Sequence, residues 1–325
     1  MRRVLALSLT AACGSPSSEP ALAPEHDCAA PDASPEPTAA GHPTDGWRWE
    51  RRGALLSDDL LYGDEANIAY AEGAIAPTLV DTGAGLHLLF LRKQGSETTL
   101  WASTSPDAAT WSAPAPVTGL EADGTSYPSL VHDDDGFRLW YGSGSIAWAT
   151  SDDGLNFTPL DTVLRAGDAE FDSLSLLYPH ALATESGVRL YYTGFDGARY
   201  AIGEADCNPE ATACTGAGPL LEHDPDGWDN TSVGMPEVVE SAGETHLWYG
   251  GYDTEIANPG PWRVGKLVDG ERLLSLPLTE SGDEAFSTRD PAVVPWDGGW
   301  LMVYVGMGDD GRYRLMSATS DVCSR

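Results

Sequence analysis

Three side chains that can exchange protons stand beside prolines in this chain of 325 residues. Asp290 directly precedes a proline, whereas Glu237 and His180 each directly follow one. A carboxylate or an imidazole can act as a general base or a general acid, and two such groups in one site can do both. Each also has a structural alternative. Asp290 could pair with Arg289, Glu237 could point away from the site because neighbouring strand residues face opposite sides, and His180 could be a satisfied histidine of an inner strand.

These prolines belong to a repeat that runs through most of the chain. Five prolines are spaced by 51, 51, 57 and 55 residues: Pro77, Pro128, Pro179, Pro236 and Pro291. An aromatic residue follows each of them thirteen positions later: Phe90, Tyr141, Tyr192, Tyr249 and Tyr304. Each aromatic closes a short alternating apolar run, such as FRLWY or THLWY, and a turn with Gly or acidic residues lies between the two landmarks. Five copies in phase predict five copies of one supersecondary unit.

Each unit is predicted to consist of β-strands. The residues after each proline are apolar and β-prone, a proline is tolerated at the start of a strand, and no long window has helical periodicity. Three to four antiparallel strands, repeated five times at about 50 residues, predict an all-β, five-bladed β-propeller over residues 46–325. A β-sandwich would not keep the phase of the repeat, and the repeats of a solenoid are usually shorter. The segment at 47–57 is expected to supply the outer strand of the last blade and so to close the ring.

The N-terminal segment predicts export. Residues 1–13 have two arginines, an apolar stretch and small residues before Cys13, which is the layout of a signal peptide with a lipobox. Lipidation of Cys13 is the first interpretation, and plain secretion with cleavage nearby is the alternative. Residues 14–45 are rich in Pro, Ala, Ser, Glu and Asp and predict a disordered tether. We therefore expect a lipoprotein of the bacterial outer membrane or cell surface, joined to the membrane only through its lipid, or a secreted protein.

The cysteine count agrees with an oxidising compartment. Apart from Cys13 the chain has four cysteines, and an even number suggests two disulfides. Cys207 and Cys214 flank a short loop with Pro and Gly and are expected to pair. Cys28 would then pair with Cys323 and staple the closure of the ring. A metal site is a poor alternative, because the sequence has no CxxC motif and no histidine cluster.

The charge excludes some partners. The formal net charge is −32, from 50 acidic and 18 basic residues, so the chain would repel nucleic acid and anionic membrane surfaces. The acidic residues are spread along the repeats and predict a solvated surface. The run Asp133, Asp134 and Asp135 could hold a structural calcium ion or simply form a polar hairpin turn. We expect no other cofactor and a monomer.

Several motifs resemble a known superfamily. The segments STSPDAATW at 103–111 and ATSDDGLNF at 149–157 share a Ser-x-Asp turn, and 127–144 has the form of a second propeller blade. Together they resemble the five-bladed glycoside hydrolases of families 43, 32 and 130, which include arabinanases, β-xylosidases and β-fructosidases. This chemistry uses paired carboxylates. The three acids of family 43 precede the first three prolines of the repeat, where this chain has Ala76, Tyr127 and Tyr178.

The resemblance also suggests replacements for the missing acids. The segment STRDP at 287–291 is similar to the Arg-Asp-Pro motif of β-fructosidases, in which the Asp stabilises the transition state. Asp290 is accordingly the expected base or stabiliser, and Glu237 the expected acid. Further acids lie a few residues upstream of the blade starts, at Asp123, Asp172 and Asp229. The substrate-binding residues that we expect are His180, Tyr127, Arg289 and Asp172.

Two functions remain open at this point. One is a glycoside hydrolase with displaced carboxylates that acts on a glycan. The other is a non-catalytic propeller that binds a glycan or a protein, which the replaced acids favour. A purely structural surface lipoprotein is a third possibility, and a sialidase is disfavoured because no arginine cluster stands out for a substrate carboxylate.

Overall fold

The computed structural model of the chain describes residues 47–62, 69, 71–120, 126–167, 170–184, 187–208, 213–241, 243–253 and 261–321. Contacts divide the chain into residues 1–30 and 31–325, and all described residues belong to the second unit. The predictions for Cys13, Asp123 and the Cys28–Cys323 pair therefore lie outside the described residues, as do those for the signal peptide and the tether. No helix among the described residues is long and apolar enough to cross a membrane.

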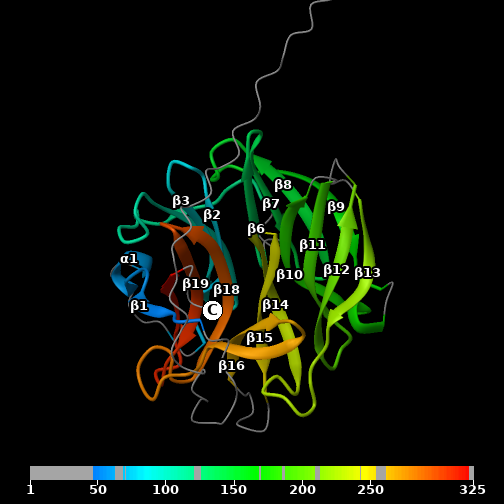
Figure 1. Cartoon of the computed structure of the whole chain (residues 1–325). Helices are drawn as coiled ribbons and strands as arrows, with labels where there is room; N and C mark the ends of the chain where they lie inside the picture. The colour runs from blue at the N-terminus through cyan, green and yellow to red at the C-terminus, as the bar shows by residue number, and fades with distance from the viewer. Residues whose placement is uncertain are drawn as a thin grey trace, which may run out of the picture. The chain divides into compact units, whose positions relative to one another are not determined.

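The described residues form four β-sheets, in which nearly all neighbouring strands are antiparallel (Figure 1). Three sheets have four consecutive strands each. The first has β6 (Ser129–Asp133), β7 (Gly136–Tyr141), β8 (Ser145–Ser151) and β9 (Thr158–Arg165), and the second has β10 (Ser175–Thr184), β11 (Gly187–Phe195), β12 (Tyr200–Cys207) and β13 (Cys214–Leu221). The third has β14 (Ser232–Ser241), β15 (Glu244–Tyr252), β16 (Trp262–Val268) and β17 (Glu271–Leu276). The fourth sheet has eight strands: β18 (Ser287–Trp296), β19 (Gly299–Met307), β20 (Tyr313–Asp321), β2 (Gly73–Asp81), β3 (Leu86–Gln94), β4 (Glu97–Ser105), β5 (Ala115–Pro116) and β1 (Glu50–Ala54).

The eight-stranded sheet consists of two four-stranded groups. A single parallel bridge between Gly73 of β2 and Tyr313 of β20 joins them. β1 pairs antiparallel with β20, so residues 50–54 lie beside the last strand of the chain. The first strands of the groups contact one another in the order β2, β6, β10, β14 and β18, and β18 in turn contacts β2 (Figure 1). One short helix, α1 (Asp58–Tyr62), and one 3₁₀ turn, η1 (Glu170–Asp172), complete the described elements.

The five prolines of the repeat share one backbone conformation. Each lies in a first strand or directly before it, and the residue before each proline has a positive φ between 47° and 58°: Ala76, Tyr127, Tyr178, Met235 and Asp290. A proline disfavours the right-handed helical region for the residue before it, and a positive φ is uncommon outside glycine. The strand pairing shifts register at this point in β2, β10, β14 and β18, as at a β-bulge. A bulge bends the strand and redirects side chains, so four of the five first strands share this bend, and the positive φ is common to all five.

The aromatic landmarks have a structural role. The hydroxyls of Tyr192, Tyr249 and Tyr304 each donate a hydrogen bond to an acid twenty residues upstream, at 2.9, 3.0 and 2.8 Å: Asp172, Asp229 and Glu284. All six side chains are buried. Burial raises the pKa of each of these tyrosines, which keeps the hydroxyl a donor. The bond holds the segment before the first strand against the second strand of the same sheet.

Tryptophans of the N-terminal segment pack beside β1. Trp47 and Trp49 stack at 5.8 Å between ring centroids, and Trp47 lies 5.6 Å from both Trp248 and Trp300. The ammonium of the buried Lys266 lies 3.8 Å from the centroid of the Trp47 ring. Such a desolvated cation–π contact is strongly favourable. Together these ring and cation–π contacts join residues 47–49 to strands of two different sheets, β15 and β16 in one and β19 in the other.

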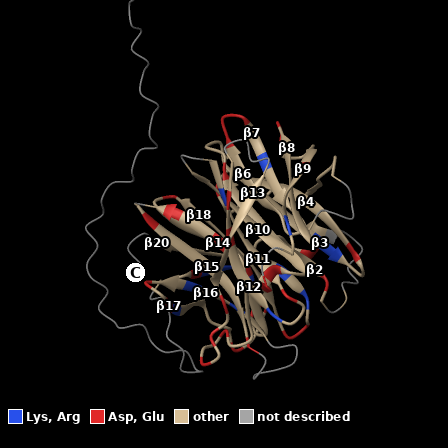
Figure 2. Cartoon of the chain, turned by 90° about the vertical axis from the view of Figure 1, so that its right-hand side faces the viewer, with Lys and Arg blue, Asp and Glu red and all other residues tan. Residues whose placement is uncertain are grey.

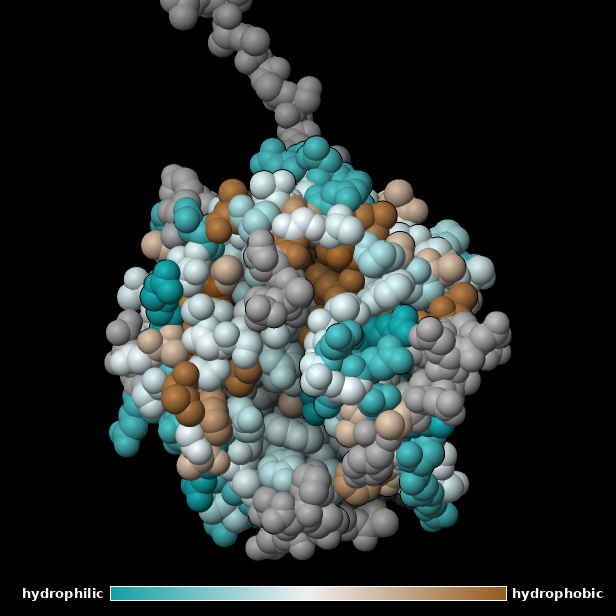
Figure 3. All heavy atoms as spheres, turned by 180° about the vertical axis from the view of Figure 1, so that it is seen from behind, coloured by the Kyte–Doolittle hydropathy of each residue, from teal (hydrophilic) through white to brown (hydrophobic). Residues whose placement is uncertain are grey.

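The predicted disulfide between Cys207 and Cys214 is confirmed, and it joins the neighbouring ends of β12 and β13. Figure 2 shows Asp and Glu gathered mainly in the turns between strands, in agreement with a solvated acidic surface. In Figure 3, most of the face in view has hydrophilic to intermediate residues, and apolar residues are visible at the surface in small groups.

Candidate functional site

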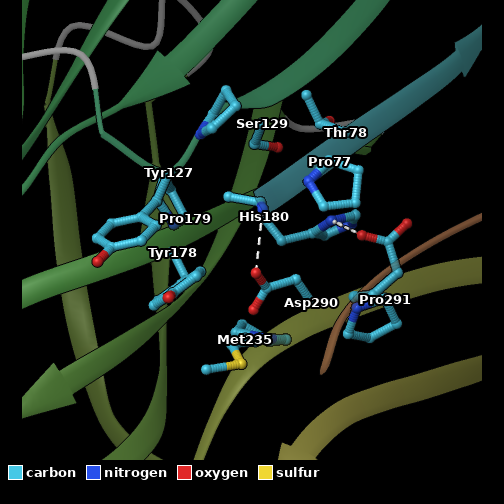
Figure 4. A pocket seen from close by; sticks show the side chains of 14 residues that line it. Pro77, Thr78, Tyr127, Ser129, Tyr178, Pro179, His180, Met235, Asp290 and Pro291 are labelled. Carbon is cyan, nitrogen blue, oxygen red and sulfur yellow. Dashed lines mark hydrogen bonds and ion pairs between the residues drawn. The ribbon is translucent and has the colours of Figure 1, made fainter. Parts of the chain in front are cut away.

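The prolines of the repeat surround a small cavity, which we call the axial cavity (Figure 4). It measures about 30 Å³, enough for roughly one or two water molecules. It is lined by each proline and its neighbours, at positions 76–78, 127–129, 178–180, 235–237 and 290–291. The starts of five strands from the four sheets meet at this cavity and bring Asp290, Glu237 and His180 to one place. None of these groups is close to the others in the sequence.

A much larger cavity, the aromatic cavity, adjoins the first. It measures about 560 Å³ and shares Tyr127, Tyr178 and Met235 with the axial cavity. Six of its lining residues are aromatic: Tyr127, Tyr178, Tyr200, Tyr252, Trp262 and Tyr313. The rings of Tyr127 and Tyr178 lie 3.7 Å apart, whereas Trp262 lies 5.1 Å from Tyr252 and 6.3 Å from Tyr200. The cavity thus has aromatic walls contributed by several sheets.

Both oxygens of Asp290 are engaged in hydrogen bonds. Oδ1 accepts from Nε of Arg289 at 3.0 Å, and Oδ2 accepts from the backbone N–H of Ala76 at 3.0 Å (Figure 4). The second bond joins β18 to β2, which are the first strands of the two groups in the eight-stranded sheet. The side chain is buried. Asp290 is therefore held by a cation and by a main-chain donor rather than presented to open space.

Arg289 connects Asp290 with the aromatic cavity. Its Nη2 donates a hydrogen bond of 2.7 Å to the hydroxyl of Tyr178, and its guanidinium lies 5.5 Å from the ring centroid of Tyr313. Burial lowers the pKa of Arg289, but Asp290, Tyr178 and Tyr313 together raise it more, so the net shift is upward. Burial raises the pKa of Tyr178 well above its ordinary value. The Tyr178 hydroxyl therefore stays protonated and accepts the hydrogen bond from Arg289 as a neutral phenol.

Glu237 and His180 form a largely but not fully buried pair across two sheets, with 12% and 15% of their side-chain surfaces exposed. His180 Nδ1 lies 2.9 Å from Glu237 Oε2, and its Nε2 lies 2.7 Å from the carbonyl oxygen of Val238. Both neighbours are acceptors, so the imidazole donates from both nitrogens as an imidazolium. Burial lowers the pKa of His180, but Glu237 and the Val238 carbonyl raise it more, and the net shift is upward. Glu237 Oε1 accepts from the backbone N–H of Val293 at 2.8 Å.

The side chain of the residue after four of the five prolines bonds to the main chain of the next first strand. Thr78 Oγ1 accepts from the N–H of Leu130 at 2.9 Å, and Ser129 Oγ accepts from the N–H of Ala181 at 2.9 Å. His180 and Glu237 make the corresponding bonds at the third and fourth positions, to Val238 and Val293. The fifth position is Ala292, which has no polar side chain, and Asp290 makes the link to β2 instead. His180, Glu237 and Asp290 therefore connect adjacent first strands.

The structure brings five of the predicted site residues to the two cavities: Asp290, Glu237, His180, Tyr127 and Arg289. Asp172 lines neither cavity, because its carboxylate accepts the hydroxyl of Tyr192 in the blade interior. Asp229 makes the equivalent bond to Tyr249 and an ion pair of 2.7 Å with Arg272, and burial raises its pKa.

Sequence reasoning missed four aromatic residues of the cavity wall. Tyr200, Trp262 and Tyr313 are the first residues of β12, β16 and β20, and Tyr252 is the last residue of β15. The sequence does contain a pattern that indicates three of them, because an aromatic residue stands at the start of the third apolar run in each of the last three repeats. The repeat marks where third strands begin, and strand ends on one side of the sheets face the same cavity.

The described residues offer no evident metal site. No group of three or more His, Cys, Asp or Glu within the described ranges could hold a metal ion. In the acidic turn before β7, Asp133 accepts from the N–H of Asp135 and pairs with Arg138. These contacts are those of a polar hairpin turn.

The shifted pKa of His180 predicts a pH-dependent stability. A group whose pKa is raised on folding stabilises the protein fully below its unfolded pKa, about 6.5 for histidine, and this contribution is lost as the pH rises through the folded pKa. We expect the stability difference between the wild type and His180→Gln to be largest near about pH 6 and to shrink toward about pH 9. Urea unfolding at several pH values measures this, and a difference that does not change with pH would contradict the imidazolium assignment.

Comparison with known proteins places the fold. No family model matches the chain, and no curated protein matches it. Among solved structures, that of BT0996 in complex with RGII has a TM-score of 0.64 at 13% identity, with 87% of this chain and 94% of that protein covered. The α-L-arabinofuranosidase PaAbf62A from Podospora anserina, in complex with cellotriose, has a TM-score of 0.60 at 14% identity over 85% and 97% of the two proteins.

A third similar structure is the α-L-arabinanase of Cellvibrio cellulosa complexed with arabinohexaose. Its TM-score is 0.57 at 11% identity, and 76% of this chain and 91% of that protein are covered. The chain therefore has the β-propeller fold of these glycoside hydrolases. At such low identity the likeness concerns the fold, and function has to be argued from the site.

Proposed function

We propose that this chain is an exported, five-bladed β-propeller that binds a glycan in the aromatic cavity. Two features support five blades: the closed order of contacts among the five first strands, and the single bridge that divides the eight-stranded sheet into two groups. β1 would complete the fifth blade beside β20. The similar structures with arabinohexaose and cellotriose show that proteins of this fold bind oligosaccharides.

The observation that carries the proposal is the aromatic wall. Sugar rings present flat faces of C–H groups, which pack well on aromatic rings, while hydroxyls need polar partners at the edge. The cavity has six aromatic residues and several hydroxyl groups, among them those of Thr193, Thr231 and Ser232. Its volume of about 560 Å³ lies in the range of small-ligand sites and would accommodate a short oligosaccharide.

The contacts of the carboxylates favour recognition over hydrolysis. A general base must reach a water and a general acid must reach the leaving oxygen. Asp290 and Glu237 instead use their oxygens to hold Arg289, His180 and backbone N–H groups. Hydrolysis is the second candidate, because both carboxylates line the same cavity. Sugar release from arabinan, xylan or fructan that is lost in both Asp290→Asn and Glu237→Gln would establish it.

Binding should depend on Trp262. We expect Trp262→Ala to weaken glycan binding about 30-fold, or about 2 kcal/mol, because it removes the largest stacking surface of the cavity. A glycan array identifies the ligand, and calorimetric titration then compares wild type and variant. Trp101→Ala is the matched control, since Trp101 is also half-buried but lies outside the cavity. Equal weakening in both variants, or none in either, would place the ligand elsewhere.

The proposal includes export. The disulfide between Cys207 and Cys214 supports it, because disulfides persist in oxidising compartments. Lipidation of Cys13, a tether over residues 14–45 and a Cys28–Cys323 bridge complete the proposed plan. Mass spectrometry of the membrane fraction would detect the lipid on Cys13, and non-reducing peptide mapping would detect the second bridge.

A further inference from the structure

The charges around the aromatic cavity differ from those of the rest of the chain. The sequence has 50 acidic and 18 basic residues, yet none of the described residues that line this cavity is Asp or Glu. Two are basic: Lys93 and Arg289. Lys93 is one of only two lysines in the sequence, and the other, Lys266, is buried against Trp47. The one accessible lysine therefore stands in the cavity.

Each cation has hydrogen-bonding capacity left for a ligand. The ammonium of Lys93 makes no hydrogen bond or ion pair to any residue in the described part of the chain. Arg289 uses Nε for Asp290 and Nη2 for Tyr178, and its Nη1 makes no hydrogen bond within the described ranges. Its side chain keeps 14% of its surface exposed. A guanidinium held on two sides is pre-ordered to bind an oxygen on the third.

The acid near Lys93 is occupied by the main chain. Glu72 accepts hydrogen bonds from the N–H of Ala69 at 2.8 Å and from the N–H of Gly95 at 2.7 Å. These bonds, more than the charge of Lys93, lower the pKa of Glu72. Glu72 does not line the cavity. It therefore holds two loops together, and the ammonium of Lys93 stays available.

We infer that the ligand is an acidic glycan, in which carboxylates of uronic acid units bind Arg289 Nη1 and Lys93 while sugar rings stack on the aromatic wall. This inference rests on the proposed function, whose ligand class it narrows. Charge-assisted hydrogen bonds to carboxylates are shorter and stronger than neutral ones, and Nη1 of Arg289 and the ammonium of Lys93 are charged donors that a carboxylate can engage. The overall charge of −32 opposes a short oligosaccharide inside the cavity less than an extended polyanion along the surface, because surface charges more than about 8 Å away are largely screened at physiological salt.

The test compares each acidic oligosaccharide with its neutral form. Oligogalacturonates, glucuronate-containing oligosaccharides and their carboxyl-reduced counterparts are titrated into the full-length protein by calorimetry. We expect the acidic form of the true ligand to bind at least about tenfold more tightly than its reduced form. The preference should fall as salt is raised, because the added contact is electrostatic.

Two variants locate the contact. Lys93→Gln should lower the ratio of the affinities for the acidic and reduced forms at least about fivefold, and Lys93→Glu should lower this ratio further. Arg92→Gln is the matched control, because Arg92 is the neighbouring cation on β3, faces the other side and lies outside the cavity. Thermal unfolding of all three variants confirms that they are folded.

The outcomes separate this inference from the proposed function. Equal binding of acidic and reduced forms, or binding of neutral oligosaccharides alone, would overturn the inference and leave glycan binding intact. A preference that Lys93→Gln and Arg92→Gln reduce equally would also overturn it. Binding to no glycan of either kind would instead refute the proposed function itself.

Discussion

Replacing Asp290 by alanine is expected to lower the free energy of unfolding by about 3–5 kcal/mol. The change removes the carboxylate from a buried ion pair, and it leaves Arg289 Nε and the N–H of Ala76 without an acceptor. An uncompensated buried charge and an unpaired buried N–H are both costly. The lost bond also joins β18 to β2, so we expect unfolding to become less cooperative. Urea unfolding followed by tryptophan fluorescence and circular dichroism measures both quantities.

Asp290→Asn separates the lost charge from the lost acceptor. An asparagine oxygen can still accept from the N–H of Ala76, and asparagine tolerates the φ of 52° at this position better than most residues. We expect a loss of about 1–2 kcal/mol, well below that of the alanine variant. The exposed Asp309→Ala should change stability by less than about 0.5 kcal/mol. Wild-type stability in Asp290→Ala would show that the carboxylate is free for another role.

The second large effect is expected at Glu237. Glu237→Ala should cost about 3 kcal/mol, since it leaves the largely buried His180 imidazolium and the N–H of Val293 without their partner. The isosteric Glu237→Gln keeps an acceptor for Val293 and should cost less. Glu240→Ala on the same strand is exposed and serves as the control.

A double-mutant cycle measures the coupling between Glu237 and His180. The interaction energy between Glu237→Gln and His180→Gln should be about 1–3 kcal/mol at about pH 6 and smaller where the imidazole is neutral. Additive effects would mean that the two side chains do not interact, and Glu237 would then be available as an acid. The same proteins can be assayed for glycan binding. We expect folded Glu237→Gln to retain binding, because Glu237 lines the axial cavity and not the aromatic one.

The expected losses of stability change the role that we assign to two predicted catalytic residues. From the sequence, Asp290 and Glu237 were the carboxylates that best replaced the missing acids. Their neighbours make both of them links between strands. Glu237 is equivalent in position to Thr78 and Ser129, whereas Asp290 stands before its proline and makes the link that Ala292 cannot make. A serine or threonine at this place signals a structural hydrogen bond. An acid in such a position can be predicted as catalytic from the sequence, and only its hydrogen-bond partners show that its role is structural.

The strands were predictable because their signals are local. Alternation of apolar residues, prolines at strand starts and turns rich in Gly or acids depend on a few neighbouring residues, and all recur in each repeat. The same holds for Cys207 and Cys214, which a short loop brings together. The aromatic landmarks were also visible, although their reason was not. Tyr192 pairs with Asp172 across twenty residues, and this partner was mistaken for a ligand contact at the site.

The sequence by itself determined the repeat, its strands, one disulfide and the positions that surround the axis. Only the tertiary structure decided which side chains meet there and what they touch. A positive φ before each proline, with a bulge beside it in four of the five first strands, turns the strand starts toward one cavity, so residues from different sheets become neighbours. The aromatic wall arises in the same way, from the ends of β12, β15, β16 and β20. Such convergence depends on how sheets pack over long sequence distances, and no local pattern of residues encodes it.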